Sequence, residues 1–184
     1  MTRILSLALF ALLLIPASAD ARPVFDKPIY DPASKSYFEL HKVSREENPS
    51  AEIPELPFDT AEKYASQRMF KGVRGRLAVV KSNDTHLFLM QNFQPDQPTW
   101  IGLRYFCKLR ELRWVNGEKV TRSSFQAWDP DWDQPGNAGC VRGKGQADWM
   151  SVSFSPVRAG FRWVAKGARK HYIMYFVEYP TGGP

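Results

Sequence analysis

The sequence has little cysteine and none of the commonest enzyme motifs. Only two cysteines occur among 184 residues, which excludes a small scaffold held together by several disulfides. The sequence contains no glycine-rich phosphate loop, no HExxH motif and no GxSxG motif. Without these motifs, the most familiar classes of nucleotide-binding protein, metalloprotease and serine hydrolase are excluded.

The composition is that of a folded domain. Apolar residues make up 43% of the chain and charged residues 24%, so global disorder is excluded. The length suits one domain with a substantial core. With 25 Lys and Arg against 19 Asp and Glu, the formal charge is +6, which permits acidic partners without identifying one.

The first 21 residues have the layout of a secretory signal peptide. Arg3 precedes an apolar run from Ile4 to Ile15, Pro16 ends this run, and small residues at 17–21 offer cleavage sites. The apolar run is shorter than the roughly 20 residues that span a bilayer. We expect a cleaved, secreted or periplasmic protein with no stable membrane span. The alternative is an uncleaved membrane anchor.

Export affects the interpretation of the two cysteines. In an oxidising compartment, Cys107 and Cys140 are expected to form a disulfide, which would stabilise the chain by a few kcal/mol. The alternative is a pair of buried thiols, because sequence does not show whether the two sulfur atoms meet.

Two helical segments precede a series of strands. Residues 22–35 predict an irregular lead-in, 37–43 a strand and 44–57 a proline-rich loop. The helical spacing that begins at Asp59 predicts a first helix capped by Asp59 or Thr60, and Ser82 is expected to cap a second helix. Strands are then predicted at 100–103, 112–115, 149–154, 161–164 and 172–179.

This order predicts an α+β fold, with two helices packed on antiparallel sheets. Asn116-Gly117 is a strong signal for a hairpin turn. Residues 125–145 are rich in proline and glycine and predict a long irregular loop. We place the folded domain at 36–180, followed by a short tail at 181–184.

The order of these features resembles the C-type lectin-like domain family. The most specific motif is Trp100-Ile101-Gly102-Leu103, which resembles the WIGL core motif of that family. Phe58 to Ala65 resembles its first helix, 75–80 the segment before its second helix, and Trp114 to Gly117 its W-x-D/N-G hairpin. Cys140 followed by Trp149 resembles the second half of the long loop and the next strand. The resemblance implies a fold and leaves the ligand open.

The sequence departs from the family's disulfide pattern. Ala65 and Val177 stand where the family usually joins its first helix to its last strand by a disulfide. The second family bridge would join Cys140 to the position of Phe154, so Cys107 becomes a substitute partner for Cys140. The resemblance therefore implies a domain that depends on side-chain packing more than its relatives do.

The family's calcium and sugar triplets are also altered. Sugar-binding members generally use EPN or QPD in the long loop and WND on the next strand. This chain has Gln134-Pro135-Gly136 and Trp149-Met150-Ser151 at those places, which removes most of the side-chain oxygens that Ca²⁺ requires. We expect no cofactor. A looser calcium site at Asp129, Asp131 and Asp133 is the alternative to our interpretation of these carboxylates as solvated turn residues.

The long loop also contains the best candidates for ligand contact. Exposed tryptophans stack on sugar rings, and neighbouring polar side chains bind hydroxyl groups. The alternative for one of the tryptophans, Trp128, is a place in the core. The predicted ligand-binding residues are Trp128, Asp131, Trp132, Asp133, Gln134 and Asn137.

Positive charge gathers in two further stretches. Residues 104–122 carry six cations against two acids, and 142–170 carry seven cations against Asp148 alone. The second stretch could attract anionic glycans, lipids or other polyanions, or could be an ordinary solvated face. His41, His86 and His171 have no metal-ligand spacing, and no nucleic-acid-binding motif is present.

These observations predict an exported, non-catalytic module that recognises a carbohydrate or a protein through its long loop without calcium. One alternative is an envelope structural or interaction protein that docks polyanions through its basic face. The other is an enzyme related to formylglycine-generating enzymes, which resemble this fold but are larger and use paired cysteines.

Overall fold

The computed structural model describes residues 23–50, 52–130, 149–156, 161–167 and 170–184. The predicted signal peptide therefore lies outside the described residues, as does most of the predicted long loop. Within the described part of the chain, no helix has the length and apolar character needed to cross a membrane.

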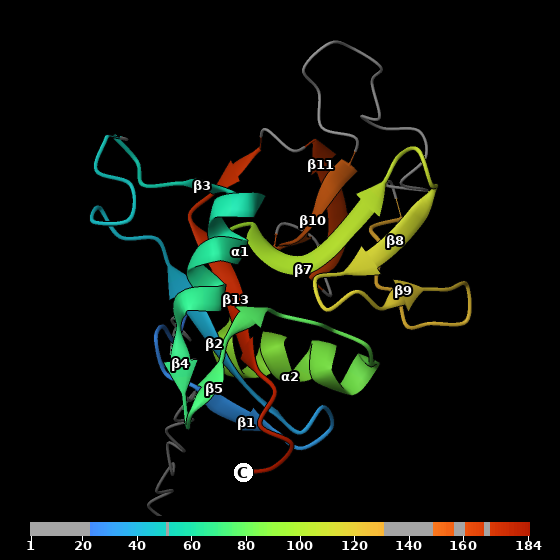
Figure 1. Ribbon diagram of the computed structural model, residues 1–184, viewed down its shortest axis with the longest axis horizontal. Helices are drawn as coiled ribbons and strands as arrows, with labels where there is room; N and C mark the ends of the chain where they lie inside the picture. The colour runs from blue at the N-terminus through green and yellow to red at the C-terminus, as the bar shows by residue number, and fades with distance from the viewer. Residues whose placement is uncertain (1–22, 51, 131–148, 157–160, 168–169) are drawn as a thin grey trace, which may run out of the picture.

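The main sheet places the first long strand beside the last one. Strand β13 pairs antiparallel with β2 over its whole length, from Met174 opposite Lys42 to Tyr179 opposite Tyr37. This pairing closes the domain (Figure 1). The main path of the sheet runs in the order β1 (Ile29–Asp31), β2 (Ser36–Lys42), β13 (Met174–Tyr179), β7 (Thr99–Phe106), β10 (Trp149–Ser155) and β11 (Arg162–Gly167).

Two expectations about this sheet need correction. The lead-in at 22–35 was expected to be irregular, but it contains β1, which forms a hairpin with β2 because Asp31 accepts hydrogen bonds that tighten the turn. The sheet was expected to be antiparallel throughout, but β13 pairs parallel with β7. The chain crosses over after β11 and inserts β13 between β2 and β7, which sets this direction.

Several short elements complete the fold. The predicted hairpin at Asn116-Gly117 is confirmed, with Gly117 at φ +88° between β8 and β9. A second tight hairpin, β4 to β5, was not predicted; its turn residues Lys71 and Gly72 both have positive φ. The short strands are β3 (Leu56–Pro57), β4 (Met69–Phe70), β5 (Val73–Arg74), β6 (Arg76–Leu77), β8 (Glu111–Trp114), β9 (Lys119–Val120) and β12 (His171–Tyr172).

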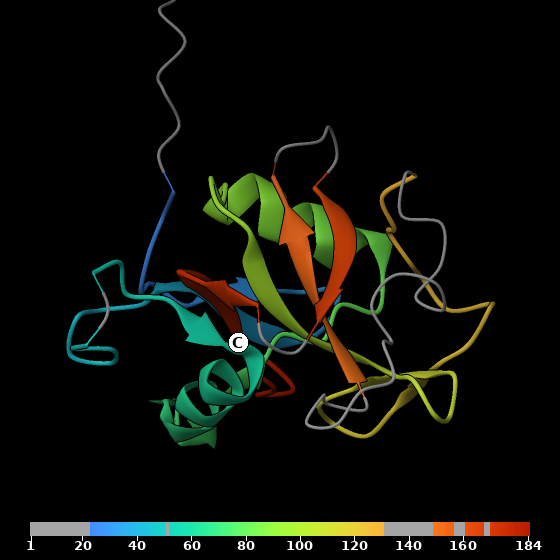
Figure 2. The same ribbon diagram turned by 90° about the horizontal axis from the view of Figure 1, so that it is seen from above.

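The two helices lie on opposite faces of the β2–β13 sheet (Figure 2). Helix α2 (Asn83–Phe93) begins as predicted, because the Ser82 hydroxyl accepts a hydrogen bond of 3.1 Å from the Thr85 N–H. The predicted capping of α1 (Phe58–Gln67) by Asp59 or Thr60 is wrong. The helix starts at Phe58, with Pro57 at the N-cap position and no side-chain cap.

Strand β13 alternates between two cores. Met174 and Phe176 face the larger cluster, which includes residues of α2, whereas Tyr175, Val177 and Tyr179 face a second cluster with α1. This alternation follows from the two-residue period of a strand. Trp100 is fully buried in the second cluster, and its indole N–H donates a 2.9 Å hydrogen bond to the Leu56 carbonyl oxygen.

Packing fills the place where the resemblance implied a missing disulfide. Ala65 on α1 and Val177 on β13 are both fully buried. Gly75 lies between them: a Cβ there would be 2.5 Å from the Ala65 carbonyl oxygen and 2.8 Å from Val177 Cγ1. The helix and the final strand therefore approach closely because residue 75 has no side chain.

Candidate functional site

The start of the predicted long loop is fixed to strand β11. The Trp163 N–H donates to the Ala127 carbonyl oxygen at 2.7 Å, and the Asp129 N–H donates to the Trp163 carbonyl oxygen at 3.0 Å. These bonds place Trp128 beside Trp163 in a parallel bridge. The chain thus enters the long loop from a defined position on the sheet.

Trp128 and Phe125 both pack on the buried ring of Trp163. Each pair is T-shaped, with ring centroids 5.6 Å apart. Trp128 is half-buried, and its indole N–H donates a 2.7 Å hydrogen bond to Gln126 Oε1. This packing agrees with the alternative in which Trp128 belongs to the core, and its use in ligand contact stays a prediction.

Asp129 is not the solvated turn residue that we expected. It is only 4% exposed, and its backbone N–H donates to the Trp163 carbonyl oxygen on β11. The other predicted contacts lie outside the described residues, and their roles stay predictions: Asp131, Trp132, Asp133, Gln134 and Asn137.

Strand β10 carries the residues that stand where the family's calcium triplet is expected. Met150 is fully buried in the larger core cluster. Ser151 is also fully buried, and its hydroxyl lies 3.4 Å from the Lys166 carbonyl oxygen on β11. Neither side chain offers a carboxylate oxygen to a surface ion.

Trp149 and Arg104 form an aromatic and charged cluster beside the loop-bearing strands. The Arg104 guanidinium lies 4.6 Å from the ring centroid of Phe58 and 4.7 Å from that of Trp149. It also forms ion pairs of 2.6 Å with Asp59 and Glu62 on α1. Arg104 therefore ties β7 to α1, and its charge is already compensated.

One cysteine can be placed. Cys107, in the turn after β7, is disulfide-bonded. Cys140, the other cysteine of the sequence, lies outside the described residues, so the predicted pairing stays a prediction.

A charged cluster that the sequence did not predict lies near β2. One ligand atom each from Asp26, Glu39 and His41 fall within 4.8 Å of one another, a spacing that could suit a metal ion. However, Arg68 already forms ion pairs with both Asp26 and Glu39, so a cation occupies the centre of this group. We interpret the cluster as an ion-pair network that joins α1 to β2. Its members are far apart in the sequence, and no local motif marks them.

His41 extends this network to the loop after β2. Its Nδ1 lies 2.5 Å from Asp26, and its Nε2 lies 3.1 Å from Glu47. Burial raises the pKa of Glu47, but hydrogen bonds from the Ser44 N–H and His41 outweigh burial and leave this pKa lowered. Burial and the nearby Glu39 carboxylate raise the pKa of Tyr179 to about 12.

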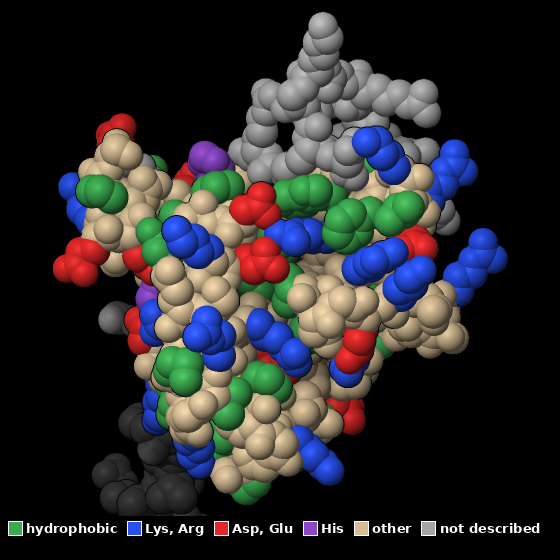
Figure 3. Space-filling view, in the orientation of Figure 1, with side chains coloured by type: hydrophobic (Ala, Val, Ile, Leu, Met, Phe, Trp, Pro, Cys, Tyr) green, Lys and Arg blue, Asp and Glu red, His purple; other side chains and the backbone are tan. Residues whose placement is uncertain are grey.

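The basic residues divide into paired and unpaired groups. Arg113 and Lys119 form ion pairs with Glu111, and acidic side chains are interspersed among the cations on the face shown in Figure 3. In the second basic stretch, Arg162, Lys166 and Lys170 are exposed and form no ion pair with any described residue. Arg142, Lys144, Arg158 and Arg169 lie outside the described residues.

Solved structures with the same fold are numerous. Human lithostathine is 13% identical, with a TM-score of 0.59, and the match covers 90% of this chain and 99% of that one. The C-type carbohydrate-recognition domain of cow CD23 is 16% identical, with a TM-score of 0.57 and coverage of 86% and 96%. The C-type lectin CEL-I from Cucumaria echinata is 16% identical, with a TM-score of 0.52 and coverage of 78% and 89%.

At these identities the structures show the fold alone. None of the curated proteins compared with the chain matches it. The family described as "Lectin C-type domain" matches residues 58–168, from the start of α1 to one residue past the end of β11, and thus more than half of the chain. The chain therefore belongs to the C-type lectin domain family.

Proposed function

We propose that this protein is an exported, non-catalytic module that binds a surface carbohydrate or protein through its long loop, without calcium. Membership of the C-type lectin domain family supports a binding function, and the sequence of residues 1–21 supports export. Binding would be reversible and would involve no covalent chemistry.

The observation that carries the calcium-independent part is the burial of Met150 and Ser151. A calcium site of the family's usual kind needs several side-chain oxygens at this strand. Here one position is a thioether in the core, and the other is a hydroxyl directed at a neighbouring strand. A ligand must then be held by direct contacts rather than through an ion.

Carbohydrate is the first ligand class to test. The cow CD23 structure is described as a carbohydrate-recognition domain in the presence of a GlcNAc2Man3 oligosaccharide, and similarity to it supports this choice without fixing the sugar. Trp132 is the proposed stacking residue. Trp128 would act mainly as the anchor of the loop, because its ring packs on Trp163 and its N–H is donated to Gln126.

A glycan array probed with and without a calcium chelator tests this proposal. We expect glycan binding that survives the chelator. Binding that the chelator abolishes would contradict calcium independence, and the lack of any glycan binding would favour a protein ligand.

The variant Trp132→Ala tests the location of the site. We expect the variant to lose about tenfold or more in affinity with an unchanged thermal midpoint, as for other aromatic contact residues. Leu109→Ala is the matched control, because Leu109 is 56% exposed and lies in the turn after β7. Equal affinity of Trp132→Ala and the native chain would place the site elsewhere.

The second candidate is a module that docks polyanions through its basic face. Arg162, Lys166 and Lys170 favour it, because they are exposed and form no ion pair with a residue that the structure describes. Retention on immobilised heparin that falls steeply with salt, and that is lost in Lys166→Gln/Lys170→Gln but not in Trp132→Ala, would support this alternative.

A further inference from the structure

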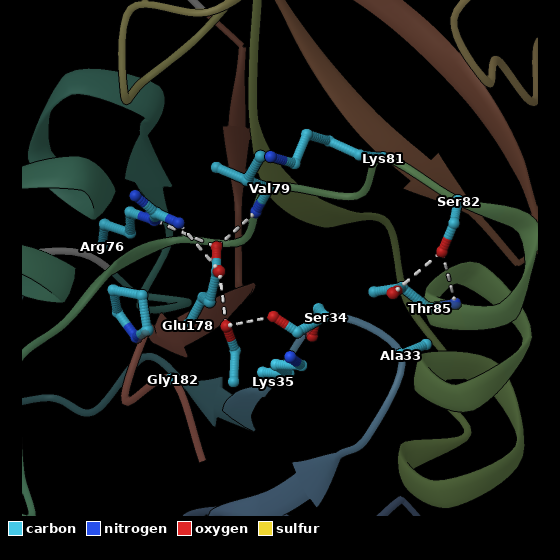
Figure 4. Close-up of a pocket in the computed structure, with 12 residues that line it drawn as sticks. Ala33, Ser34, Lys35, Arg76, Val79, Lys81, Ser82, Thr85, Glu178 and Gly182 are labelled. Carbon is cyan, nitrogen blue, oxygen red and sulfur yellow. Dashed lines mark hydrogen bonds and ion pairs between the residues drawn. The ribbon is translucent and has the colours of Figure 1, made fainter.

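A cavity of about 350 Å³ with charged and hydroxyl side chains in its wall lies at the end of the domain where the first strand and the C-terminal segment meet. Its walls come from the turn between β1 and β2, from β6, from the segment that enters α2, and from the chain around and after the end of β13 (Figure 4). In Figure 1, β1 and α2 lie at the bottom, whereas β10 and β11 lie in the upper half. Its volume is within the range of small-molecule sites.

The carboxylate in the wall of this cavity is fully used by the protein. Glu178 is 3% exposed and accepts four hydrogen bonds of 2.9–3.0 Å: one from the Ser36 hydroxyl, two from Arg76 and one from the Val79 N–H. Two carboxylate oxygens offer about four lone-pair positions in total. Glu178 therefore has no remaining capacity to bind a cation or a ligand donor.

The second carboxylate near the cavity is saturated as well. Asp31 accepts bonds from the N–H groups of Ala33 and Ser34 and from the hydroxyls of Ser34 and Thr85, at 2.8–3.3 Å. Ser34 and Thr85 thus donate their hydroxyl protons within the protein; the Ser34 oxygen keeps its lone pairs free, whereas the Thr85 oxygen already accepts a 3.1 Å hydrogen bond from the Ser82 hydroxyl. Acceptors remain on the cavity wall, but they are neutral.

The hydrogen-bond donors of the cavity that are not fully engaged within the protein belong to cationic side chains. Lys35 is exposed, and its ammonium group forms no hydrogen bond or ion pair with a described residue. Arg76 has five N–H bonds and uses two of them on Glu178. Lys81 lies 3.1 Å from Glu118, but both side chains are about half exposed, so this ion pair is weak.

We infer that this cavity is a second binding site and that it takes an oxyanion, namely a carboxylate, sulfate or phosphate group, either free or on a sugar unit. Lys35, Arg76 and Lys81 bind the anionic oxygens, and the hydroxyl oxygens of Ser34 and Ser82 accept hydrogen bonds from hydroxyl groups of the ligand. The site shares no residue with the long loop, so it can fail or succeed independently of the proposed function.

The chain offers a closely matched pair of test variants. Lys35→Asn/Lys81→Gln removes two charges from the cavity. Lys35 has φ +54°, a conformation that Asn adopts readily, so this change does not strain the turn. Lys71→Asn/Lys119→Gln is the control: Lys71 has φ +48°, and Lys119 is an exposed, ion-paired lysine like Lys81. The two variants have the same net charge.

The test is an NMR titration of the ¹⁵N-labelled chain with sodium sulfate, sodium phosphate, sodium glucuronate and glucose, at constant ionic strength. We expect the anions, but not glucose, to shift the backbone amide signals of Lys35, Val79 and Ser82. Lys35→Asn/Lys81→Gln should weaken this binding about fivefold or more, and the control variant less than about twofold.

The two sources of the oxyanion are distinguished by their affinities. Glucuronate that binds more tightly than sulfate and phosphate identifies an acidic sugar, whereas the reverse order identifies a free ion. The inference is overturned by the absence of localised shifts, by equal weakening in both variants, or by glucose binding as tightly as glucuronate.

Discussion

Two regions of this domain are stabilised by different means. The terminal region, formed by α1, β1, β2, β6 and β13, buries the carboxylates of Glu39 and Glu178 against Arg68 and Arg76. The loop-bearing region, formed by β7 to β11, contains the disulfide-bonded Cys107 and a group of rings around Trp163.

The difference separates the residues that hold the last strand in place from those that position the proposed recognition loop. In the terminal region, ion pairs between distant residues fix how the last strand meets the rest of the domain; Arg76 and Glu178 are 102 residues apart. Breaking such a pair leaves a buried charge, so this region has little freedom to vary. The loop-bearing region instead fixes the entry to the long loop, to which we assign ligand binding in our proposal.

The largest expected effect separates two tryptophans. Trp100→Ala should lower the free energy of unfolding by about 3–5 kcal/mol, because it removes a fully buried ring and its hydrogen bond to Leu56. Trp128→Ala should cost about 1–2 kcal/mol, since this ring is half-buried. Denaturant unfolding measures both values, and equal losses would show that the ring at the entry to the long loop contributes as much to stability as the fully buried ring.

The next effect tests the close approach of α1 and β13. Gly75→Ala should cost about 2–3 kcal/mol, because the added methyl group would lie 2.5 Å from the Ala65 carbonyl oxygen. Gly167→Ala is the control, since a methyl group at that position would meet no atom within 4 Å, and it should change stability by less than about 0.5 kcal/mol. A tolerated Gly75→Ala would contradict tight packing at this position.

The buried ion pair gives a somewhat smaller effect. Arg76→Met should cost about 2 kcal/mol, because it leaves Glu178 buried with only Ser36 and the Val79 N–H as partners. This figure is below the usual cost for a buried pair, since the Arg76 side chain is 29% exposed. Lys81→Met breaks an exposed pair and should cost less than about 0.5 kcal/mol. Thermal or urea unfolding measures both losses, and a larger loss in Lys81→Met than in Arg76→Met would contradict a stabilising buried pair of Arg76 and Glu178.

The smallest effect is pH-dependent. The folded pKa of Glu47 lies below its ordinary value of 4.5, so ionised Glu47 stabilises the fold above that pH, and this contribution is lost as the pH falls through the folded pKa. Glu47→Gln should therefore cost up to about 1 kcal/mol near pH 7 and less at lower pH. Urea unfolding across pH 3–7 checks this, with the exposed Glu52→Gln as control. If the stability difference between Glu47→Gln and the native chain grew as the pH falls, the pKa of Glu47 would not be lowered in the folded state.

Features encoded by neighbouring residues could be predicted from the sequence. The cap at Ser82 and the turn at Asn116-Gly117 are set by local hydrogen bonds and backbone conformation, and both are confirmed. The parallel pairing of β13 with β7 is not local, because it depends on where the chain crosses over. The early start of α1 after Pro57 was missed because Asp59 and Thr60 are favourable capping residue types.

The sites follow the same division. The resemblance carried by Trp100 to Leu103 identified the family from the sequence alone. The burial of Asp129 and the cavity around Glu178 could not be predicted, since each depends on backbone or side-chain partners contributed by separate elements. Sequence patterns therefore indicated the proposed recognition loop, whereas only the fold located the cavity around Glu178.

Thermal unfolding in excess Ca²⁺ and in a calcium chelator tests the central claim most directly. An ion bound at 100 times its Kd would stabilise the fold by about 2.7 kcal/mol, which raises Tm by several degrees for a chain of this size. The account predicts midpoints that agree within about 1 °C. A Tm that rises by several degrees with Ca²⁺, but not with Mg²⁺, would contradict it.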